Sequence, residues 1–314
     1  MRQNRAFTLV ELLIALVIIG LLLAILLPAV QAAREAARAS HCRSNLRQIA
    51  IAVQSYHDGK RRLPPSNFQK ELNEGPDSQA WSWLAHLLPY LEEQNLFVQG
   101  GIPRKTLRES NVADSQLDAF LCPSDHFSHL GPRTGAGNLP NKTDEEPPFP
   151  VGQTNYKGVS GANWGEDSSI KLTDIGTDWP NDGKNGSKDG QDNGDGILFR
   201  STWQRPRSFR HVTDGLSKTF LAGENLPEKN NWCSWPYANN AHGTCAIPPN
   251  VNPVEGRDYS PSFWPNVAGF RSAHPGGVYF SYTDASVRFV ADDVDLAVYR
   301  GMATIAGRET GTLP

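Results

Sequence analysis

Two residues near the carboxyl end of the chain have side chains that can do acid-base chemistry or bind a metal. His274 and Asp284 stand ten positions apart and bracket a segment with strand-like alternation. An imidazole beside a carboxylate can act as a base with its orienting acid, or hold a metal ion. We favour a structural hydrogen bond, because no Gly-x-Ser-x-Gly, His-Glu-x-x-His or P-loop motif accompanies the pair. We therefore expect a protein that is not an enzyme.

A run of Asp, Asn and Gly residues, NDGKNGSKDGQDNGDG, is a second candidate site. Its closely spaced oxygens, with Asp189, Asp192 and Asp195 as the expected ligands, suit a Ca²⁺ ion. Counted from Asp189, the sixth position is Gly194, as in an EF-hand, but the twelfth is Arg200 instead of the bidentate Glu. We expect weak calcium binding at most, with a solvated loop as the alternative, and no other cofactor.

The four cysteines contain no Cys-x-x-Cys pair, so they give no zinc-ribbon or thioredoxin-like signal. In an exported body they can form two disulfides, and four cysteines allow three pairings. Cys42 lies on an apolar helical stripe and Cys122 ends a short apolar run, which favours a bridge between them. Cys233 and Cys245 lie twelve positions apart in a segment rich in Pro and Asn, and we expect them to form the second bridge.

A carboxylate interrupts the apolar amino-terminal stretch. Residues 7 to 27 are predominantly apolar and carry one charge, Glu11. They suffice to span a membrane, because roughly 20 helical residues cross the hydrocarbon core. Arg2 and Arg5 precede the span, so the positive-inside rule predicts a body outside the cytoplasm. A carboxylate within a span costs on the order of 3 kcal/mol and usually marks function.

The sequence AFTLVE around Glu11 resembles the class III signal of type IV prepilins and type II secretion pseudopilins, with Ala6 where Gly is commonest. The resemblance implies that a prepilin peptidase cuts between Ala6 and Phe7 and methylates the new terminus, removing residues 1 to 6 as a leader. Glu11 would then neutralise the terminal amine of a neighbouring subunit. An ordinary secretory signal, cut before Ala33, is the alternative. It leaves Glu11 unexplained and requires an apolar region longer than the usual ~7–15 residues.

The apolar helix is expected to continue into the body. Residues 7 to 30 form the span, Pro28 bends the chain near its end, and residues 31 to 58 keep the helical period. One stripe of this continuation is apolar and should pack against a sheet. The stripe consists of Cys42, Leu46, Ile49, Ala50 and Val53.

Residues 59 to 314 are expected to form a globular α+β body. A short helical unit follows Trp81 and Trp83, whose rings we expect in the core. The segment from about 130 to 196 is rich in Gly, Pro, Asn and Asp and should be dominated by loops. Strands are expected at residues 197–199 and 219–222, and a hairpin at residues 278–282 and 287–290.

Beyond the amino terminus, the chain is similar to a bacterial family of uncharacterised prepilin-like proteins. The segments that carry the resemblance read QAAREAARASHCRSNLRQIAIAVQSYHD, LPYLEEQNLF, LCPSD, TNYKGVSG and HVTDGLSKTFLAGE, followed by His274-x9-Asp284. It implies a pilin-like fold, with the long helix packed on an antiparallel sheet that has long loops. The family's Asp-Gly is Asp284-Ala285 here. A non-Gly residue at positive φ costs roughly 1 kcal/mol, so a different turn is expected.

The net charge of −3 offers no basic surface for phosphates, which argues against nucleic acid as a partner. We expect a non-catalytic subunit of a type IV pilus-like or type II secretion-like assembly. It would cross the inner membrane once, with a periplasmic or extracellular body. Its partners would be a prepilin peptidase, the membrane, and copies of itself or other pseudopilins. The alternative is an anchored protein that binds a ligand, for example a glycan, through Trp164, Trp203 and Trp264.

Overall fold

The computed structural model describes residues 9–68, 75–134, 149–162, 191–251, 260–262 and 267–307. The predictions made for Ala6, Phe7, Asp189, Trp164 and Trp264 lie outside these residues.

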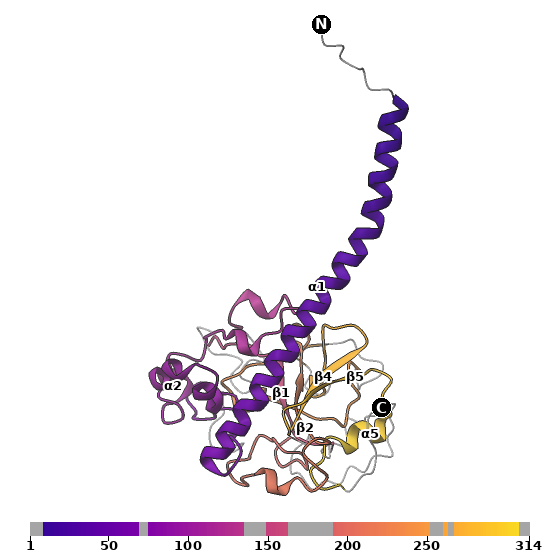
Figure 1. Cartoon of the computed structure of the whole chain (residues 1–314). Helices are drawn as coiled ribbons and strands as arrows, with labels where there is room; N and C mark the ends of the chain where they lie inside the picture. The colour runs from indigo at the N-terminus through magenta and orange to yellow at the C-terminus, as the bar shows by residue number, and fades with distance from the viewer. Residues whose placement is uncertain are drawn as a thin grey trace.

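One helix, α1 (Leu9–Lys60), contains 52 residues and runs from the apolar amino-terminal stretch into the body. At 1.5 Å per residue it is about 78 Å long. Pro28 lies inside α1 and does not end it, and Figure 1 shows the helix curving over its free half. A proline in a helix removes one backbone hydrogen bond and bends the axis. The helix therefore runs past residue 30 without a break.

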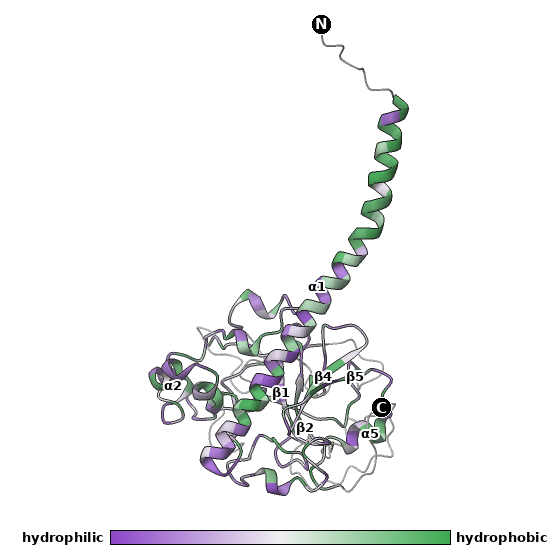
Figure 2. Cartoon of the chain, viewed as in Figure 1, coloured by the Kyte–Doolittle hydropathy of each residue, from purple (hydrophilic) through white to green (hydrophobic). Residues whose placement is uncertain are grey.

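The amino-terminal part of α1 stands clear of the body, and Figure 2 colours most of its ribbon as hydrophobic, with a hydrophilic position near the free end. Between Leu9 and Val30, 16 large hydrophobic side chains are 43% to 79% exposed. Its length and hydropathy are sufficient for a helix that crosses a membrane. Because full burial of such a side chain is worth about 1.5–3 kcal/mol, this part of α1 requires an apolar surrounding that the described body does not provide.

The carboxyl-terminal half of α1 is built into the body. The predicted apolar stripe is confirmed, since Cys42, Leu46, Ile49, Ala50 and Val53 are all fully buried. Spacings of three and four residues place these side chains on one side of the helix. The stripe contacts the sheet and the helical unit that follows Trp83.

The sheet has five strands in the order β3-β1-β2-β4-β5. Their bounds are β1 (Tyr156–Val159), β2 (Phe220–Glu224), β3 (His242–Gly243), β4 (Gly277–Tyr282) and β5 (Val287–Ala291). The α+β class is confirmed. The sheet is mixed and not antiparallel as expected, because β3 pairs parallel with β1. β3 runs opposite to β2 and pairs with the outer edge of β1.

The carboxyl-terminal hairpin of β4 and β5 is confirmed. Ala285 in its turn has φ +65°, so the left-handed conformation is kept without glycine, and the Asp284 carboxylate accepts from the Ser286 backbone N–H at 2.9 Å.

The strand expected at residues 197–199 is wrong. These residues are buried but form no strand. The Leu198 N–H makes a single hydrogen bond to the Val159 carbonyl, at the end of β1, with a distance of 3.1 Å. A short buried apolar run does not by itself distinguish a strand from a buried loop.

Two apolar clusters cover the two faces of the sheet. The larger lies under α1 and contains Trp81 and Trp83, both fully buried, which confirms their place in the core. The smaller lies on the opposite face, where α5 (Leu296–Gly301) places Tyr299 near the rings of Phe220 and Phe280. Short helical elements connect these layers. They are η1 (Ala85–Tyr90), α2 (Gln94–Gly100), α3 (Leu107–Ser110), η2 (Asp118–Phe120), η3 (Ser128–Leu130), η4 (Phe209–His211), η5 (Pro227–Lys229) and η6 (Ala238–Asn240).

The burial of α1 predicts a difference between two isoleucines of the same helix. Ile49 is fully buried, whereas Ile51 is 45% exposed. Ile49→Ala should lower the free energy of unfolding by about 2–5 kcal/mol, because it leaves a cavity under the helix. Ile51→Ala should change it by less than about 0.5 kcal/mol. Denaturant unfolding of the full chain in detergent measures both. Equal losses would show that α1 does not pack through this stripe.

Candidate functional site

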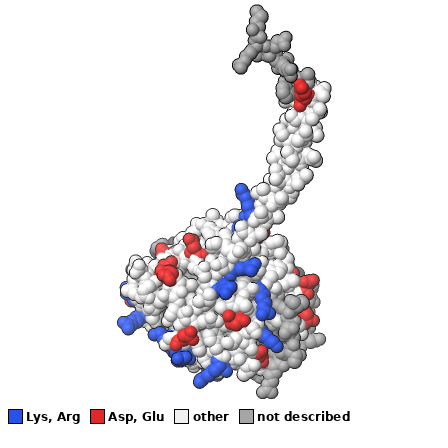
Figure 3. Space-filling view, viewed as in Figure 1, with Lys and Arg blue, Asp and Glu red and all other residues white. Residues whose placement is uncertain are grey.

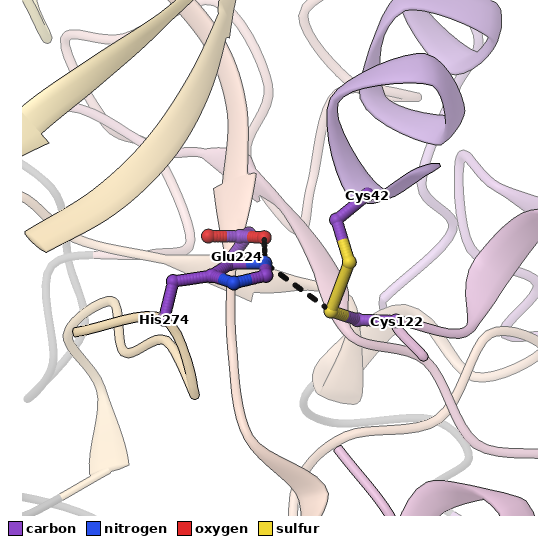
Figure 4. Close-up of side chains that lie close together, drawn as sticks. All are labelled: Cys42, Cys122, Glu224 and His274. Carbon is purple, nitrogen blue, oxygen red and sulfur yellow. Dashed lines mark hydrogen bonds and ion pairs between the residues drawn. A yellow bond between two sulfur atoms is a disulfide. The ribbon is translucent and has the colours of Figure 1, made fainter. Parts of the chain in front are cut away.

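A cluster of chemically active side chains lies where α1 enters the body. Figure 4 shows Cys42 from α1, Cys122 from the segment after η2, Glu224 from the end of β2, and His274 from the loop before β4. Glu35, two helical turns before Cys42, completes the cluster through a hydrogen bond to His274. We call these five residues the junction.

A disulfide joins Cys42 to Cys122, with the two Cα atoms 5.2 Å apart. This pairing confirms the prediction. Asn45, one turn further along α1, donates to the carbonyls of Asp118 at 3.2 Å and Leu121 at 2.9 Å. Because the disulfide closes a loop of 80 residues, it is worth on the order of 4 kcal/mol in the chain-entropy description.

Cys122 is held in place by a buried amide network. Its N–H donates to the side-chain oxygen of Asn155 at 2.9 Å. The amide nitrogen of Asn155 donates in turn to the Asp125 carboxylate at 2.8 Å and to the Asn225 carbonyl at 3.0 Å. Buried polar groups stabilise a structure only when they are hydrogen-bonded, and this network meets that requirement.

His274 lies between two carboxylates and is only 4% exposed. Its Nδ1 is 2.6 Å from Glu35 Oε1, and since an ionised carboxylate only accepts, the ring donates this bond. Its Nε2 lies 3.4 Å from Glu224 Oε1 and 3.6 Å from Cys122 Sγ. The Tyr279 ring packs edge to face against the His274 ring, with the two ring centroids 5.4 Å apart. The ring is thus fixed on both nitrogens and one side.

The Glu224 side chain is 2% exposed, and its two oxygens have different surroundings. Oε2 accepts from the Ser272 hydroxyl at 2.8 Å and from the Tyr279 N–H at 2.9 Å. Oε1 is buried, and no group in the described residues makes a hydrogen bond of good geometry with it. It faces His274 Nε2 instead. The two bonds at Oε2 fix the direction in which Oε1 points, toward the His274 ring.

Glu35 links His274 to two further residues, Arg38 and Ser124. Arg38, one turn along α1, donates to Glu35 Oε2 from two nitrogens, at 2.6 and 2.9 Å. The Ser124 hydroxyl donates to the same carboxylate at 3.2 Å. Partial burial acts to raise the pKa of Glu35, but the bonds from His274, Arg38 and Ser124 outweigh it and hold the pKa below 4.5.

The electrostatics of His274 follow from the same contacts. Burial of the ring acts against its charged form. The Glu224 and Glu35 carboxylates outweigh this burial and raise the pKa of His274 above 6.5. The junction therefore stabilises a positive charge between its two carboxylates.

The structure separates His274 from Asp284, so the predicted hydrogen bond between them is wrong. Asp284 binds Ser286 in the hairpin turn, while His274 binds Glu35, 239 residues away in sequence. β4 carries the chain away from the junction, which places the two residues at opposite ends of the strand. Sequence reasoning missed both carboxylate partners of His274. One usable signal was Glu224 itself, an acid that ends a fully buried strand.

The predicted bridge between Cys233 and Cys245 is wrong, because both are free thiols and both are buried. The Cys233 thiol donates to the Asn225 side-chain oxygen at 3.3 Å. Cys245 belongs to the apolar cluster under α5. Burial raises the pKa of both thiols, which keeps them protonated and unreactive. The two residues pack into different surroundings although they are close in sequence.

Two of the three predicted calcium ligands lie in the described residues, and both carboxylates contact protein groups. Asp192 is 2.7 Å from the guanidinium of Arg200, the residue that replaces the bidentate Glu of an EF-hand. Asp195 Oδ1 accepts from the Ala162 N–H at 3.0 Å. Calcium binding in this loop stays a prediction.

Two family models match the chain. The prokaryotic N-terminal methylation motif matches residues 1–27. The family described as "Protein of unknown function (DUF1559)" matches residues 31–297. The chain belongs to this family. All five junction residues lie within the range matched by DUF1559, whereas Glu11 lies within the methylation motif. No curated protein and no solved structure matches the chain.

The methylation motif and the exposed apolar helix mark this DUF1559 chain as prepilin-like and membrane-anchored. Figure 3 shows an acidic residue near the free end of α1, then an uncharged surface, and basic residues where the helix reaches the body. Charge and apolar surface are thus segregated along a single helix.

The junction predicts a specific cost for neutralising Glu35. Glu35→Gln keeps the shape but loses the charge that accepts from His274, Arg38 and Ser124. Hydrogen bonds to charged groups are worth about 1.5–3 kcal/mol, so we expect a loss of about 1–3 kcal/mol in the free energy of unfolding. Glu228→Gln, at an exposed site in η5, serves as the matched control and should change it by less than about 0.5 kcal/mol. Chemical denaturation of both variants makes the comparison. Equal effects would mean that Glu35 is an ordinary surface acid.

Proposed function

We propose that this DUF1559 protein is a non-catalytic, membrane-anchored subunit of a type IV pilus-like or type II secretion-like assembly. The observation that carries the proposal is the apolar half of α1, which is exposed along its whole length and begins within the methylation motif. The 22 residues from Leu9 to Val30 span about 33 Å as a helix, against ~30 Å of hydrocarbon.

The position of the charges supports an inner-membrane location with the body outside the cytoplasm. Arg2 and Arg5 precede the span, and the positive-inside rule keeps such residues on the cytoplasmic side. The body then lies in an oxidising compartment, where the Cys42–Cys122 disulfide is expected to form and persist.

The geometry of the junction supports a structural role. Acid-base catalysis needs a group within reach of a substrate proton. His274 is 4% exposed, and its two ring nitrogens already face Glu35 and Glu224. The cysteines beside it are joined in a disulfide, so they provide no thiolate nucleophile. These contacts serve to fasten α1 to the body.

Binding of a glycan or another ligand through exposed aromatic residues was the alternative. Of Trp164, Trp203 and Trp264, Trp203 lies in the described residues, is 37% exposed, and donates its indole N–H to the Phe68 carbonyl at 3.0 Å. One partly exposed ring whose indole N–H is already bonded does not by itself make a binding platform. Ligand binding through these tryptophans stays a prediction.

Processing by a prepilin peptidase predicts a defined mature terminus. The purified membrane protein should begin at Phe7 and carry an added methyl group on its terminal nitrogen. Mass spectrometry of the amino-terminal peptide measures both. A terminus at Ala33 would instead establish an ordinary secretory signal, and the membrane anchor would be lost from the mature chain.

Glu11 is proposed to set the register between neighbouring subunits by binding the terminal amine of Phe7 in an adjacent copy. The pairing would offset the cost of a carboxylate in hydrocarbon, which is on the order of 3 kcal/mol. Glu11→Gln should leave cleavage intact and remove crosslinks between spans of neighbouring subunits. Glu11→Asp keeps the charge and should retain part of the crosslinking. Coexpression of tagged chains with crosslinking in the membrane makes the test. If the Gln variant crosslinks like the wild type, Glu11 is not an assembly residue.

A further inference from the structure

The junction brings four metal-binding side chains to one point. One donor atom from each of Cys42, Cys122, Glu224 and His274 lies within 4.8 Å of all the others, and all four residues are buried. Thiolate, imidazole and carboxylate are the ligand types that zinc takes in proteins. We propose that these four side chains bind one zinc ion when the disulfide between the two cysteines is reduced.

Two edges of a tetrahedral zinc site already have the expected lengths in the structure. With Zn–S near 2.3 Å and Zn–N and Zn–O near 2.05 Å, a tetrahedron has an N···S edge of about 3.6 Å and an N···O edge of about 3.4 Å. In the structure, His274 Nε2 lies 3.6 Å from Cys122 Sγ and 3.4 Å from Glu224 Oε1. The S···S edge must open to about 3.8 Å, which requires cleavage of the sulfur–sulfur bond.

Glu224 supplies the second observation that points to a cation. Its Oε1 is buried and makes no hydrogen bond of good geometry with any group in the described residues, while Oε2 is held by Ser272 and Tyr279. A buried carboxylate oxygen without a hydrogen bond is costly unless a positive charge lies beside it. Figure 4 shows this carboxylate, the imidazole and the disulfide grouped together. In the oxidised chain the His274 ring, 3.4 Å away, is the partner of Glu224 Oε1, and in the reduced chain zinc between the two groups would take that place.

Glu35 completes the outer shell that zinc-binding histidines usually have. A metal-binding imidazole commonly donates its other ring N–H to a carboxylate, which fixes the ring and its tautomer. His274 Nδ1 donates to Glu35 at 2.6 Å, leaving Nε2 directed at the cluster. Glu35 is itself held by Arg38 and Ser124. Glu35 is thus a positioning residue for the proposed site.

The chemistry requires a reductant and releases protons. A dithiol donates two electrons and two protons to the Cys42–Cys122 bond, and its own sulfurs become a disulfide. The two new thiols then lose their protons to solvent as zinc binds, because thiolates are the ligands. Disulfide and zinc therefore exclude each other. In a chain that has not met an oxidant, zinc would replace the disulfide as the fastening between α1 and the body.

The experiment uses the full chain in detergent with Cys233→Ala and Cys245→Ala, which removes the two other thiols. A phosphine reduces the disulfide by taking oxygen from water and becoming its oxide, and Co²⁺ is then titrated as a spectroscopic probe for the zinc site. We expect one cobalt per reduced chain, with the visible absorption of tetrahedral cobalt and a thiolate charge-transfer band. Zinc should bleach both signals, and the oxidised chain should show neither.

Matched variants distinguish metal binding at the site from the effects of losing the disulfide. Cys42→Ala with Cys122→Ala lacks the disulfide, as the reduced chain does, but offers no thiolate and should not bind cobalt. His274→Ala should lose the tetrahedral spectrum. Glu35→Gln should keep the spectrum and bind about 10- to 100-fold more weakly, as expected for a carboxylate that orients a ligand.

Absence of the spectrum in the reduced chain, or the same spectrum in the double cysteine variant, would overturn the proposal. Stability provides a second measurement in case the reduced chain unfolds. Zinc should raise the Tm of the reduced chain and leave that of the oxidised chain unchanged, because a ligand stabilises the state to which it binds. If zinc fails to raise the Tm of the reduced chain, the proposal is wrong. These outcomes do not depend on whether the protein assembles into filaments.

Discussion

The structure depends on one constraint: a single continuous helix has to pack on the body with one half and expose an apolar surface with the other. The carboxyl-terminal half of α1 buries a stripe of apolar side chains on the body, while its amino-terminal half exposes apolar side chains on every side. A helix transmits rotation along its axis, so fixing one half fixes the direction of every side chain on the other. The contacts that hold α1 at its exit from the body therefore decide how the span is presented to its neighbours.

The junction provides this fixation with few groups. Cys42 and Glu35 lie seven residues apart, or about two helical turns, and so face the same side of α1. The disulfide anchors one point to the segment after η2, and His274 anchors the other to the end of the sheet. Two attachments on one face prevent both sliding and rotation of the helix. Buried charges seldom add stability over apolar packing, but in some proteins they specify a unique arrangement. We infer this role for the carboxylates here.

Local patterns in the sequence predicted a substantial part of this arrangement. The 3.6-residue period identified the stripe from Cys42 to Val53, and alternation identified the hairpin of β4 and β5, because both signals arise from short-range geometry. The AFTLVE motif, through its resemblance, identified the methylation segment. The bridge from Cys42 to Cys122 followed from the expectation that both residues face the core.

The predictions that were wrong share a physical cause: contacts between residues far apart in sequence produce no periodic pattern in the sequence. His274 pairs with Glu35 across most of the chain, and the sequence offered Asp284 as a nearer acid. The parallel edge strand β3 has two residues, too few for alternation to be seen. Cys233 and Cys245 are close in sequence, but Cys233 binds Asn225 while Cys245 lies in the apolar cluster under α5, and both stay free thiols.

We infer that α1 is one uninterrupted helix, fixed to the body at the junction, that carries its orientation into the membrane. Hydrogen exchange of the full chain in lipid bilayers tests it most directly, because amide protection reports whether backbone hydrogen bonds open locally. We expect continuous protection from the apolar half of α1 through Arg38 and Cys42 into the buried stripe, with weakening confined to the turn around Pro28. A rapidly exchanging segment between Val30 and Arg38 would reveal a flexible joint there. Such a joint would contradict the claim that the junction sets the orientation of the span.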